Sequence, residues 1–283
     1  MRSSVVVFMA SLMVGLAFPG CEGGKMNGKI SLEVSTSDLS DAALMDLSGK
    51  RIYFGHQSVG FNIVEGLKDL MKSDPRIRLN IIESDNLSMS TGPVFMHSPV
   101  GKNGDPELKI REFGSIIEKG GIKADFAFLK FCYVDIDGKT DVRALFEKYR
   151  SAAKALSARY PKTTFLHVTA PLRTQPVSYK TRIKQVIGLG TPWEVAENIR
   201  RNEFNELLVN EYGKKAPVFD IAVLESTYPD GRRASFGANG KTYSMLAPEY
   251  THDGGHLNEI GRRIAARELL RTLSSLSAIP SGK

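Results

Sequence analysis

Residues 51–60 read RIYFGHQSVG, and this stretch predicts how the fold begins. Its apolar first half, residues 51–55, indicates a short buried strand, and apolar residues at helical spacing over 63–71 indicate a helix directly behind it. A glycine-flanked turn that carries Ser58 therefore joins a strand to a helix. A strand that leads straight into a helix is the opening unit of an α/β fold.

The same alternation of strand and helix continues along the chain. Apolar runs and helical spacing predict further strands at 77–83, 125–131, 163–169 and 217–221, and further helices at 106–119, 142–156, 192–212 and 257–276. Strands separated by helices favour a parallel sheet that is covered on both faces. We therefore predict an α/β fold over residues 46–277, a three-layer α/β/α sandwich of flavodoxin-like type with a five-stranded parallel sheet.

Ligand sites in doubly wound sheets lie at the carboxyl ends of the strands, in the loops that lead into helices. Here those loops fall within residues 55–60, 91–105, 132–137, 171–191 and 228–256. The connections 84–105 and 222–256 are too long for simple links between elements, so we expect them to carry function or to form a lid.

The composition excludes several classes of protein. With 283 residues, 42% hydrophobic and 24% charged, the chain is neither disordered, collagen-like nor a coiled coil as a whole. The net charge of +7 comes without a long basic run, so we expect no nucleic-acid partner. Two cysteines exclude a disulfide-rich scaffold and a cysteine-based zinc site, and we expect no metal and no other cofactor.

The N-terminus predicts export. Arg2 precedes an apolar stretch at 5–18 that is about as long as the core of a signal peptide. The sequence AFPGC at 17–21 resembles a bacterial lipobox, which implies lipidation of Cys21; an ordinary secretory signal is the alternative. We expect 1–21 to be the signal, 22–45 a tether and N-terminal extension, and the mature protein to lie in the bacterial cell envelope, periplasmic or anchored to the outer membrane through the lipid alone.

Two polar motifs, 198 residues apart, suggest chemistry. A serine on a tight turn before a helix presents its hydroxyl at the sheet edge, beside N–H groups that stabilise an oxyanion; the alternative role for Ser58 is a helix cap. In the segment 251–261, Asp253 can orient His256, and His256 can then take a proton from a serine; the alternative is an exposed turn with a capping Asp. We favour catalysis because a doubly wound sheet brings both loops to the same edge.

This arrangement resembles the SGNH (GDSL-type) hydrolases, which have a strand–Gly-Asp-Ser–helix block and a late Asp-x-x-His block. The resemblance spans residues 51–273 and implies Ser58 as nucleophile, His256 as general base and Asp253 as its orienting acid. It also implies an esterase acting on acyl esters of carbohydrates or on small esters. Two further hypotheses are an O-acyltransferase in envelope polysaccharide modification and a non-catalytic glycan-binding module.

The chain departs from the family pattern at the oxyanion hole. The first block, GHQS, is one residue longer than Gly-Asp-Ser, and Val134 stands where the third block has its Asn. Loss of one such donor costs about 2.7–4 kcal/mol of transition-state stabilisation. Residues that are candidates for replacing the donor or binding substrate are Gln57, Asn103, Gly104, Lys130 and Tyr133.

Three further side chains have alternative interpretations. Lys130 interrupts an apolar strand, so it is either a site residue with Asp135 or Asp137 as its carboxylate partner, or a lysine at a strand end that reaches solvent. His97 is expected in an exposed loop or at the pocket wall. His167 lies in a predicted strand and is expected to be a hydrogen-bonded core residue.

Overall fold

The computed structural model describes residues 34–120, 124–175 and 193–277, with the side chains of Trp193 and Glu194 excepted. The expected signal segment and Cys21 lie outside the described residues. A compact unit starts at Val34, and the expected boundary at residue 46 falls inside its first helix, α1 (Asp41–Ser48). Ser40 caps this helix by accepting a hydrogen bond from the Ala43 N–H.

Strands and helices alternate along the unit, as the sequence predicts. After α1 the elements are β1 (Arg51–His56), α2 (Val59–Ser73), β2 (Ile81–Glu83), β3 (Val94–Pro99), α3 (Pro106–Lys119), β4 (Phe126–Leu129), α4 (Val142–Arg159), β5 (Thr164–Phe165), β6 (His167–Val168), α6 (Trp193–Tyr212), β7 (Val218–Phe219), α7 (Ile221–Ser226), β8 (Ser235–Ala238), β9 (Lys241–Ser244) and α8 (Glu259–Ser277). Short 3-10 turns are η1 (Leu87–Met89), η2 (Tyr133–Asp135) and η3 (Pro248–Tyr250).

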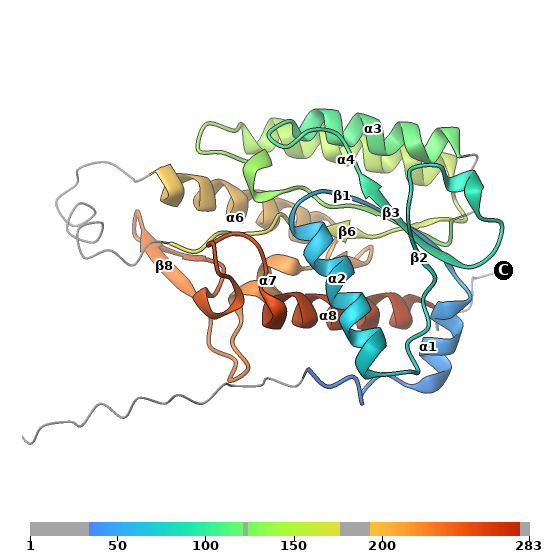
Figure 1. The fold of residues 1–283 in the computed structure, drawn as a ribbon. Coiled ribbons are helices and arrows are strands. Elements are labelled where there is room, and N and C mark those ends of the chain that lie inside the picture. The colour runs from blue at the N-terminus through green and yellow to red at the C-terminus, as the bar shows by residue number, and fades with distance from the viewer. Residues whose placement is uncertain (1–33, 121–123, 176–192, 278–283) are drawn as a thin grey trace, which may run out of the picture. The chain divides into compact units, whose positions relative to one another are not determined.

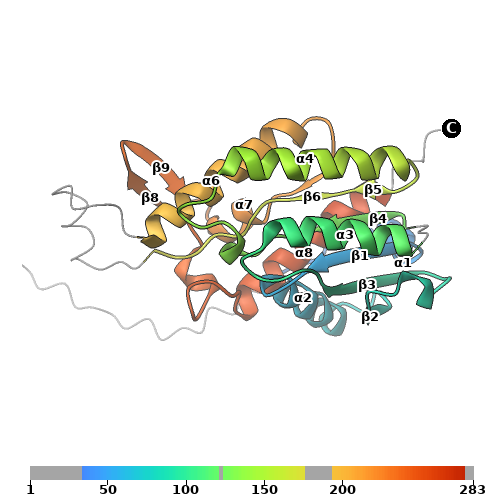
Figure 2. The same cartoon turned by 90° about the horizontal axis from the view of Figure 1, so that it is seen from above.

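The central sheet has five parallel strands in the order β2-β3-β1-β4-β5. Figure 2 shows these strands side by side in that order. Beyond β5 the same extended segment continues into β6, which pairs with β7. The N–H groups of Thr164 and Leu166 bond to β4 and its start, whereas those of His167 and Thr169 bond to carbonyls of 217–219. The segment therefore lies between β4 and β7 and extends the parallel pairing.

Helices cover both faces of the sheet, which confirms the three-layer prediction. One apolar core joins the inward faces of α1, α2 and α8 to Ile52 and Phe54 of β1. A second core, on the opposite face, joins α3, α4 and α6 to Tyr53. The alternation of neighbouring β1 residues between two cores is the two-residue period of a strand that is buried on both sides. In Figure 1, α2 and α8 lie on one face and α3 and α4 on the other.

The strand β3 lies within the connection that was expected to be a loop, and that prediction was wrong. Only Val94, Phe95 and Met96 are apolar there, and they are followed by His97 and Ser98, so the strand pattern is short. The two polar residues are nevertheless buried, because neighbouring β1 supplies their hydrogen-bond partners. The second long connection holds most of α7 and the antiparallel hairpin β8–β9. Within the described residues, no helix has the length and apolar character to cross a membrane.

Candidate active site

Ser58 occupies the turn between β1 and α2 in a strained backbone conformation. Its φ of 53° and ψ of −113° fall where residues with a side chain are rarely found. Its side chain makes no capping hydrogen bond to α2. Instead, Ser58 Oγ lies 2.8 Å from Nε2 of His256. The strained turn aims the hydroxyl away from the helix and toward the imidazole.

His256 and Asp253 lie in the loop between η3 and α8. His256 Nδ1 is 2.5 Å from Asp253 Oδ2, and the His256 N–H donates to Asp253 Oδ1 at 2.7 Å. The Gly255 N–H donates to the same oxygen at 2.9 Å. Burial alone raises the pKa of Asp253, but these hydrogen bonds outweigh it and hold the pKa well below the usual range. Asp253 is therefore ionised and fixes both the orientation and the tautomer of His256.

The packing of α2 against α8 holds the two halves of this site together, and Figure 1 shows the helices next to each other. Gly66 permits the close approach, since a Cβ there would stand 2.2 Å from the carbonyl oxygen of Arg262. Arg262 also forms an ion pair with Asp69 of α2 at 2.7 Å. The Leu257 N–H, next to His256, donates to Asn62 Oδ1 of α2 at 3.1 Å.

Tyr133 of η2 brings a phenol close to Ser58. Its ring contacts the His256 ring edge-on, with 5.7 Å between centroids, and Gly255 leaves room for it. Burial raises the pKa of Tyr133, although the nearby Arg173 and a hydrogen bond with Ser58 lower it. The hydroxyl therefore keeps its proton near neutral pH and can donate a hydrogen bond beside Ser58 Oγ.

A buried carboxylate, Asp135, ties two loops of the site together. It accepts hydrogen bonds from the N–H groups of Gly104 (2.8 Å) and Cys132 (2.6 Å), and it pairs with Lys109 Nζ at 2.6 Å. Lys109 also donates to Asn103 Oδ1 at 2.9 Å. The Gly104 N–H is thus engaged by Asp135. Asn103 binds Lys109 through its side-chain oxygen, so this bond does not use its amide nitrogen.

Gln57 and Lys130 are occupied elsewhere in the fold. The Gln57 amide nitrogen donates to the carbonyls of Val100 and Gly101, which fastens the loop after β3 to the turn of Ser58. Lys130 is fully buried and donates to the Phe131 carbonyl, 3.7 Å from Cys132 Sγ. Its expected nearby partner, Asp135, pairs with Lys109 instead. Both residues therefore hold the backbone of the loops around Ser58 through hydrogen bonds to carbonyl oxygens.

A pair of histidines lies beneath the serine turn. His56 Nε2 and His97 Nδ1 are 3.0 Å apart, and both side chains are buried. The interpretation of His97 as an exposed loop residue was wrong, because β3 places it inside the sheet. Burial lowers the pKa of both residues, so the pair is neutral. Gly60 accommodates the His56 ring, since a Cβ there would stand 2.3 Å from it.

Comparison with known proteins identifies the fold. A GDSL-like lipase from Bacteroides thetaiotaomicron matches with a TM-score of 0.51 and 12% identity, over 85% of this chain and 94% of that one. The chain has the SGNH hydrolase fold. An acetylxylan esterase from Geobacillus stearothermophilus (TM-score 0.41, 12% identity, 80% and 94% covered) and the periplasmic domain of a Salmonella lipopolysaccharide acetyltransferase (0.43, 12%, 78% and 83%) are more distant. No protein-family model and no curated protein matches the sequence.

Within the SGNH fold, the structure brings Ser58, Asp253, His256 and Tyr133 together. Gln57, Gly104 and Lys130 are placed nearby or below with their donors engaged, and Asn103 is exposed at the loop that Asp135 anchors. Lys109 and Arg173 were not predicted as site residues from the sequence. The sequence of an amphipathic helix does not indicate that one of its lysines is buried. The sequence around an arginine after a strand does not indicate which distant residues it contacts.

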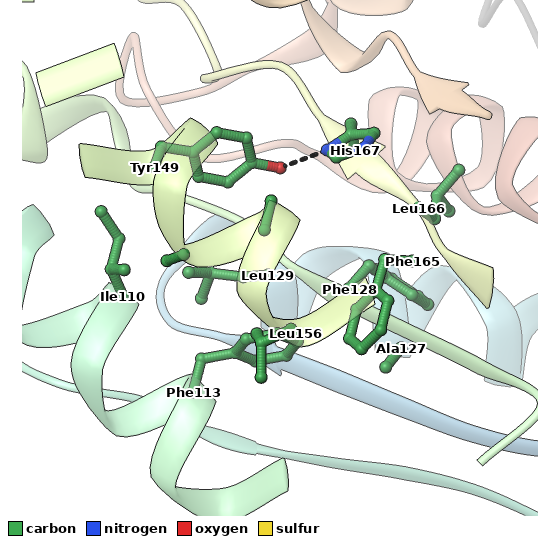
Figure 3. A pocket seen from close by; sticks show the side chains of 12 residues that line it. Ile110, Phe113, Ala127, Phe128, Leu129, Tyr149, Leu156, Phe165, Leu166 and His167 are labelled. Atoms are coloured by element: carbon green, nitrogen blue, oxygen red, sulfur yellow. Dashed lines mark hydrogen bonds between the residues drawn. The ribbon is translucent and has the colours of Figure 1, made fainter. Parts of the chain in front are cut away.

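A cavity of about 30 Å³ on the α3–α4 face of the SGNH fold is separate from this site. Figure 3 shows its apolar lining from β4, α3 and α4, with the Tyr149 hydroxyl bonded to His167 at 2.8 Å. His167 is thus a hydrogen-bonded core residue, as predicted. None of the residues that line the cavity belongs to the Ser58 site. The described residues contain no group of three or more His, Cys, Asp or Glu side chains suited to a metal ion.

Proposed function

We propose that this protein is an exported serine ester hydrolase of SGNH type that acts on acyl esters of carbohydrates or on small esters. The observation that carries the proposal is the hydrogen-bonded series from Ser58 Oγ through His256 to the Asp253 carboxylate, on a strained turn at the carboxyl end of β1. The likeness in fold to a GDSL-like lipase supports the same class of reaction.

The geometry supports a two-step mechanism. His256 Nε2 accepts the Ser58 proton while Oγ bonds to the ester carbonyl carbon, and the same proton then passes to the departing alcohol as its C–O bond breaks. Water next attacks the acyl group on Ser58, with His256 taking a proton from water and returning one to Oγ. Asp253 stays ionised throughout and stabilises the protonated imidazole.

The developing oxyanion needs donors that are not already engaged. We assign this role to the Val59 N–H at the start of α2, where helical N–H groups have no partner within the helix, and to the Tyr133 hydroxyl. Tyr133 then takes the place of the side-chain amide that the SGNH pattern supplies at position 134. The Asn103 amide nitrogen is available as a third donor.

Labelling of full-length protein with a fluorophosphonate probe tests the assignment. We expect Ser58 to be modified, with labelling lost in Ser58→Ala and strongly reduced in His256→Ala. Labelling that persists in Ser58→Ala refutes the nucleophile, and no labelling of the wild type favours a non-catalytic glycan-binding module. Hydrolysis of 4-nitrophenyl acetate with and without a glycan acceptor separates a hydrolase from an O-acyltransferase, since a transferase releases nitrophenol faster with acceptor and acylates it.

The proposed location in the cell envelope rests on residues 1–21. If Cys21 is lipidated, mass spectrometry of the mature N-terminus finds a diacylglyceryl-modified Cys21 and no residue before it. An unmodified N-terminus near that position indicates an ordinary secretory signal and a protein without a lipid anchor.

A further inference from the structure

Arg173 is a cation in the candidate active site without an ion-pair partner among the described residues. It follows β6 at the carboxyl end of the sheet, and its guanidinium lies over the Tyr133 ring, 5.3 Å from the centroid. Its one side-chain hydrogen bond in this part of the chain runs from Nε to the Gly254 carbonyl at 3.4 Å. No described residue accepts a hydrogen bond from its two terminal nitrogens.

The charge of Arg173 contrasts with that of its neighbour Arg201. Arg201 is buried, pairs with Glu197 at 2.6 Å and donates from Nε to the Tyr133 carbonyl at 2.7 Å. Arg201 therefore holds Tyr133 in place and is itself neutralised. Arg173 is only half-buried, and no carboxylate whose side chain the structure describes forms an ion pair with it.

The undescribed parts of the sequence offer few candidates for neutralising Arg173. Residues 121–123, 176–192 and 278–283 contain no Asp or Glu, and the acidic residues before 34 are Glu22 and Glu33 alone. The other acidic side chain that the structure does not describe is that of Glu194. Asp253, the carboxylate of the candidate triad, already accepts hydrogen bonds from Gly255, His256 and Thr251.

The backbone of Arg173 is held firmly. Its N–H donates to Asn198 Oδ1 at 3.0 Å, and its carbonyl accepts from Asn198 Nδ2 at 2.6 Å and from the Leu246 N–H at 3.2 Å. The Thr174 N–H adds a bond to the Gly254 carbonyl at 3.0 Å. A cation fixed in advance at one position is what selective binding of a charged group needs, because little entropy is lost on binding.

We propose that Arg173 binds a carboxylate of the substrate, so that the ester carries an anion close to the scissile bond. This inference rests on the proposed function. A guanidinium binds a carboxylate through two parallel N–H donors, and Arg173 has two terminal nitrogens that no described residue engages, beside the phenol that contacts Ser58. Sugar acids esterified on a hydroxyl and half-esters of dicarboxylic acids share this chemistry, with the charge on the alcohol or on the acyl side.

Paired substrates test the inference in full-length protein. One arm compares kcat/KM for 4-nitrophenyl acetate with that for 4-nitrophenyl hemisuccinate, where the acyl group carries the charge. The other arm compares O-acetylated methyl glucoside with O-acetylated methyl glucuronoside, where the alcohol carries it. We expect the wild type to prefer the anionic member about 10- to 100-fold in one arm, which identifies the side that carries the anion.

The variants separate charge recognition from the stacking of Arg173 on Tyr133. Arg173→Gln removes the preference and Arg173→Glu reverses it, whereas Arg173→Lys keeps a reduced preference. The ratio within each pair corrects for any general loss of activity. Arg200→Gln, which removes a neighbouring cation of α6 that is paired with Glu203, is the matched control and leaves the ratio unchanged.

Three results overturn the inference, and they have different meanings. If the wild type hydrolyses neutral and anionic members equally in both arms, Arg173 does not select an anion, and the hydrolase assignment stands. If a preference exists but survives in Arg173→Gln, another residue carries it. If no ester is hydrolysed and Ser58 is not labelled by fluorophosphonate, the proposed function itself fails, and the inference falls with it.

Discussion

The strain at Ser58 predicts that Ser58→Gly is more stable than Ser58→Ala, and that both variants are inactive. Both Ser58→Gly and Ser58→Ala remove the hydrogen bond to His256, so their comparison isolates the backbone. Alanine retains a Cβ at a φ of 53°, whereas glycine adopts this region freely.

The magnitude follows from two opposing effects. A residue held in such a region costs about 1–3 kcal/mol in the folded state, and glycine loses about 0.4–1 kcal/mol relative to alanine through its freer unfolded chain. The net expectation is that Ser58→Gly exceeds Ser58→Ala by about 1 kcal/mol in the free energy of unfolding. For a domain of this size that corresponds to a melting temperature higher by about 2–4 °C.

Thermal unfolding followed by circular dichroism measures the difference, and fluorophosphonate labelling shows that both variants are inactive. Ser90, with an extended backbone at φ −126°, is the matched control: there the glycine variant is expected to melt below the alanine variant. If Ser58→Gly melts at or below Ser58→Ala while the Ser90 pair behaves as expected, the strain is not real, and the argument that the turn presents the hydroxyl fails.

Three further predictions concern residues around the site. Tyr133→Phe is expected to lower kcat for 4-nitrophenyl acetate about 100-fold with little change in KM and an unchanged circular dichroism spectrum; an unchanged kcat would assign the oxyanion to other donors. Asp135→Asn leaves Lys109 buried without its counter-charge, so urea unfolding is expected to show a loss of about 3–5 kcal/mol, part of which Lys109→Met restores in the double variant; equal stability of the single and double variants would argue against the pair. Glu225 of α7 is buried and accepts a hydrogen bond from the N–H of Leu172, the residue before Arg173. Burial raises the pKa of Glu225 from 4.5 to about 8, so its contribution to stability is present below pH 4.5 and is lost as the pH rises to 8, by about 5 kcal/mol at most. Glu225→Gln is expected to flatten that decline in melting temperature, and a decline as steep as in the wild type would show that other groups cause it.

The layers of the fold could be predicted because the helices have apolar residues at helical spacing and most of the strands have recognisable apolar runs. The prediction failed at β3, where burial depends on partners that only the folded sheet provides: His97 on His56, and Ser98 on the Tyr53 hydroxyl at 2.8 Å. The prediction also treated β5 and β6 as one strand, because the change of pairing partner at Leu166 does not alter the hydropathy pattern.

The candidate triad could be found from two local motifs, since each contains its own chemical pattern. The surrounding residues could not, because their roles depend on contacts between distant segments. Lys109 pairs with Asp135 across 26 positions, and Arg173 meets Tyr133 through a ring contact. Lys130 was a candidate site residue because a lysine in an apolar strand needs a polar partner. In the structure that partner is the carbonyl of Phe131.

The contact between α2 and α8 has a consequence for how the protein is made. Because Ser58 and His256 come from opposite ends of the folded unit, the candidate triad forms only after the last segment of the chain has been synthesised and has docked. Contacts so distant in sequence form late and slowly during folding. If the proposed function is correct, every incomplete chain is therefore inactive, and a cut near the C-terminus abolishes activity although Ser58 stays in place.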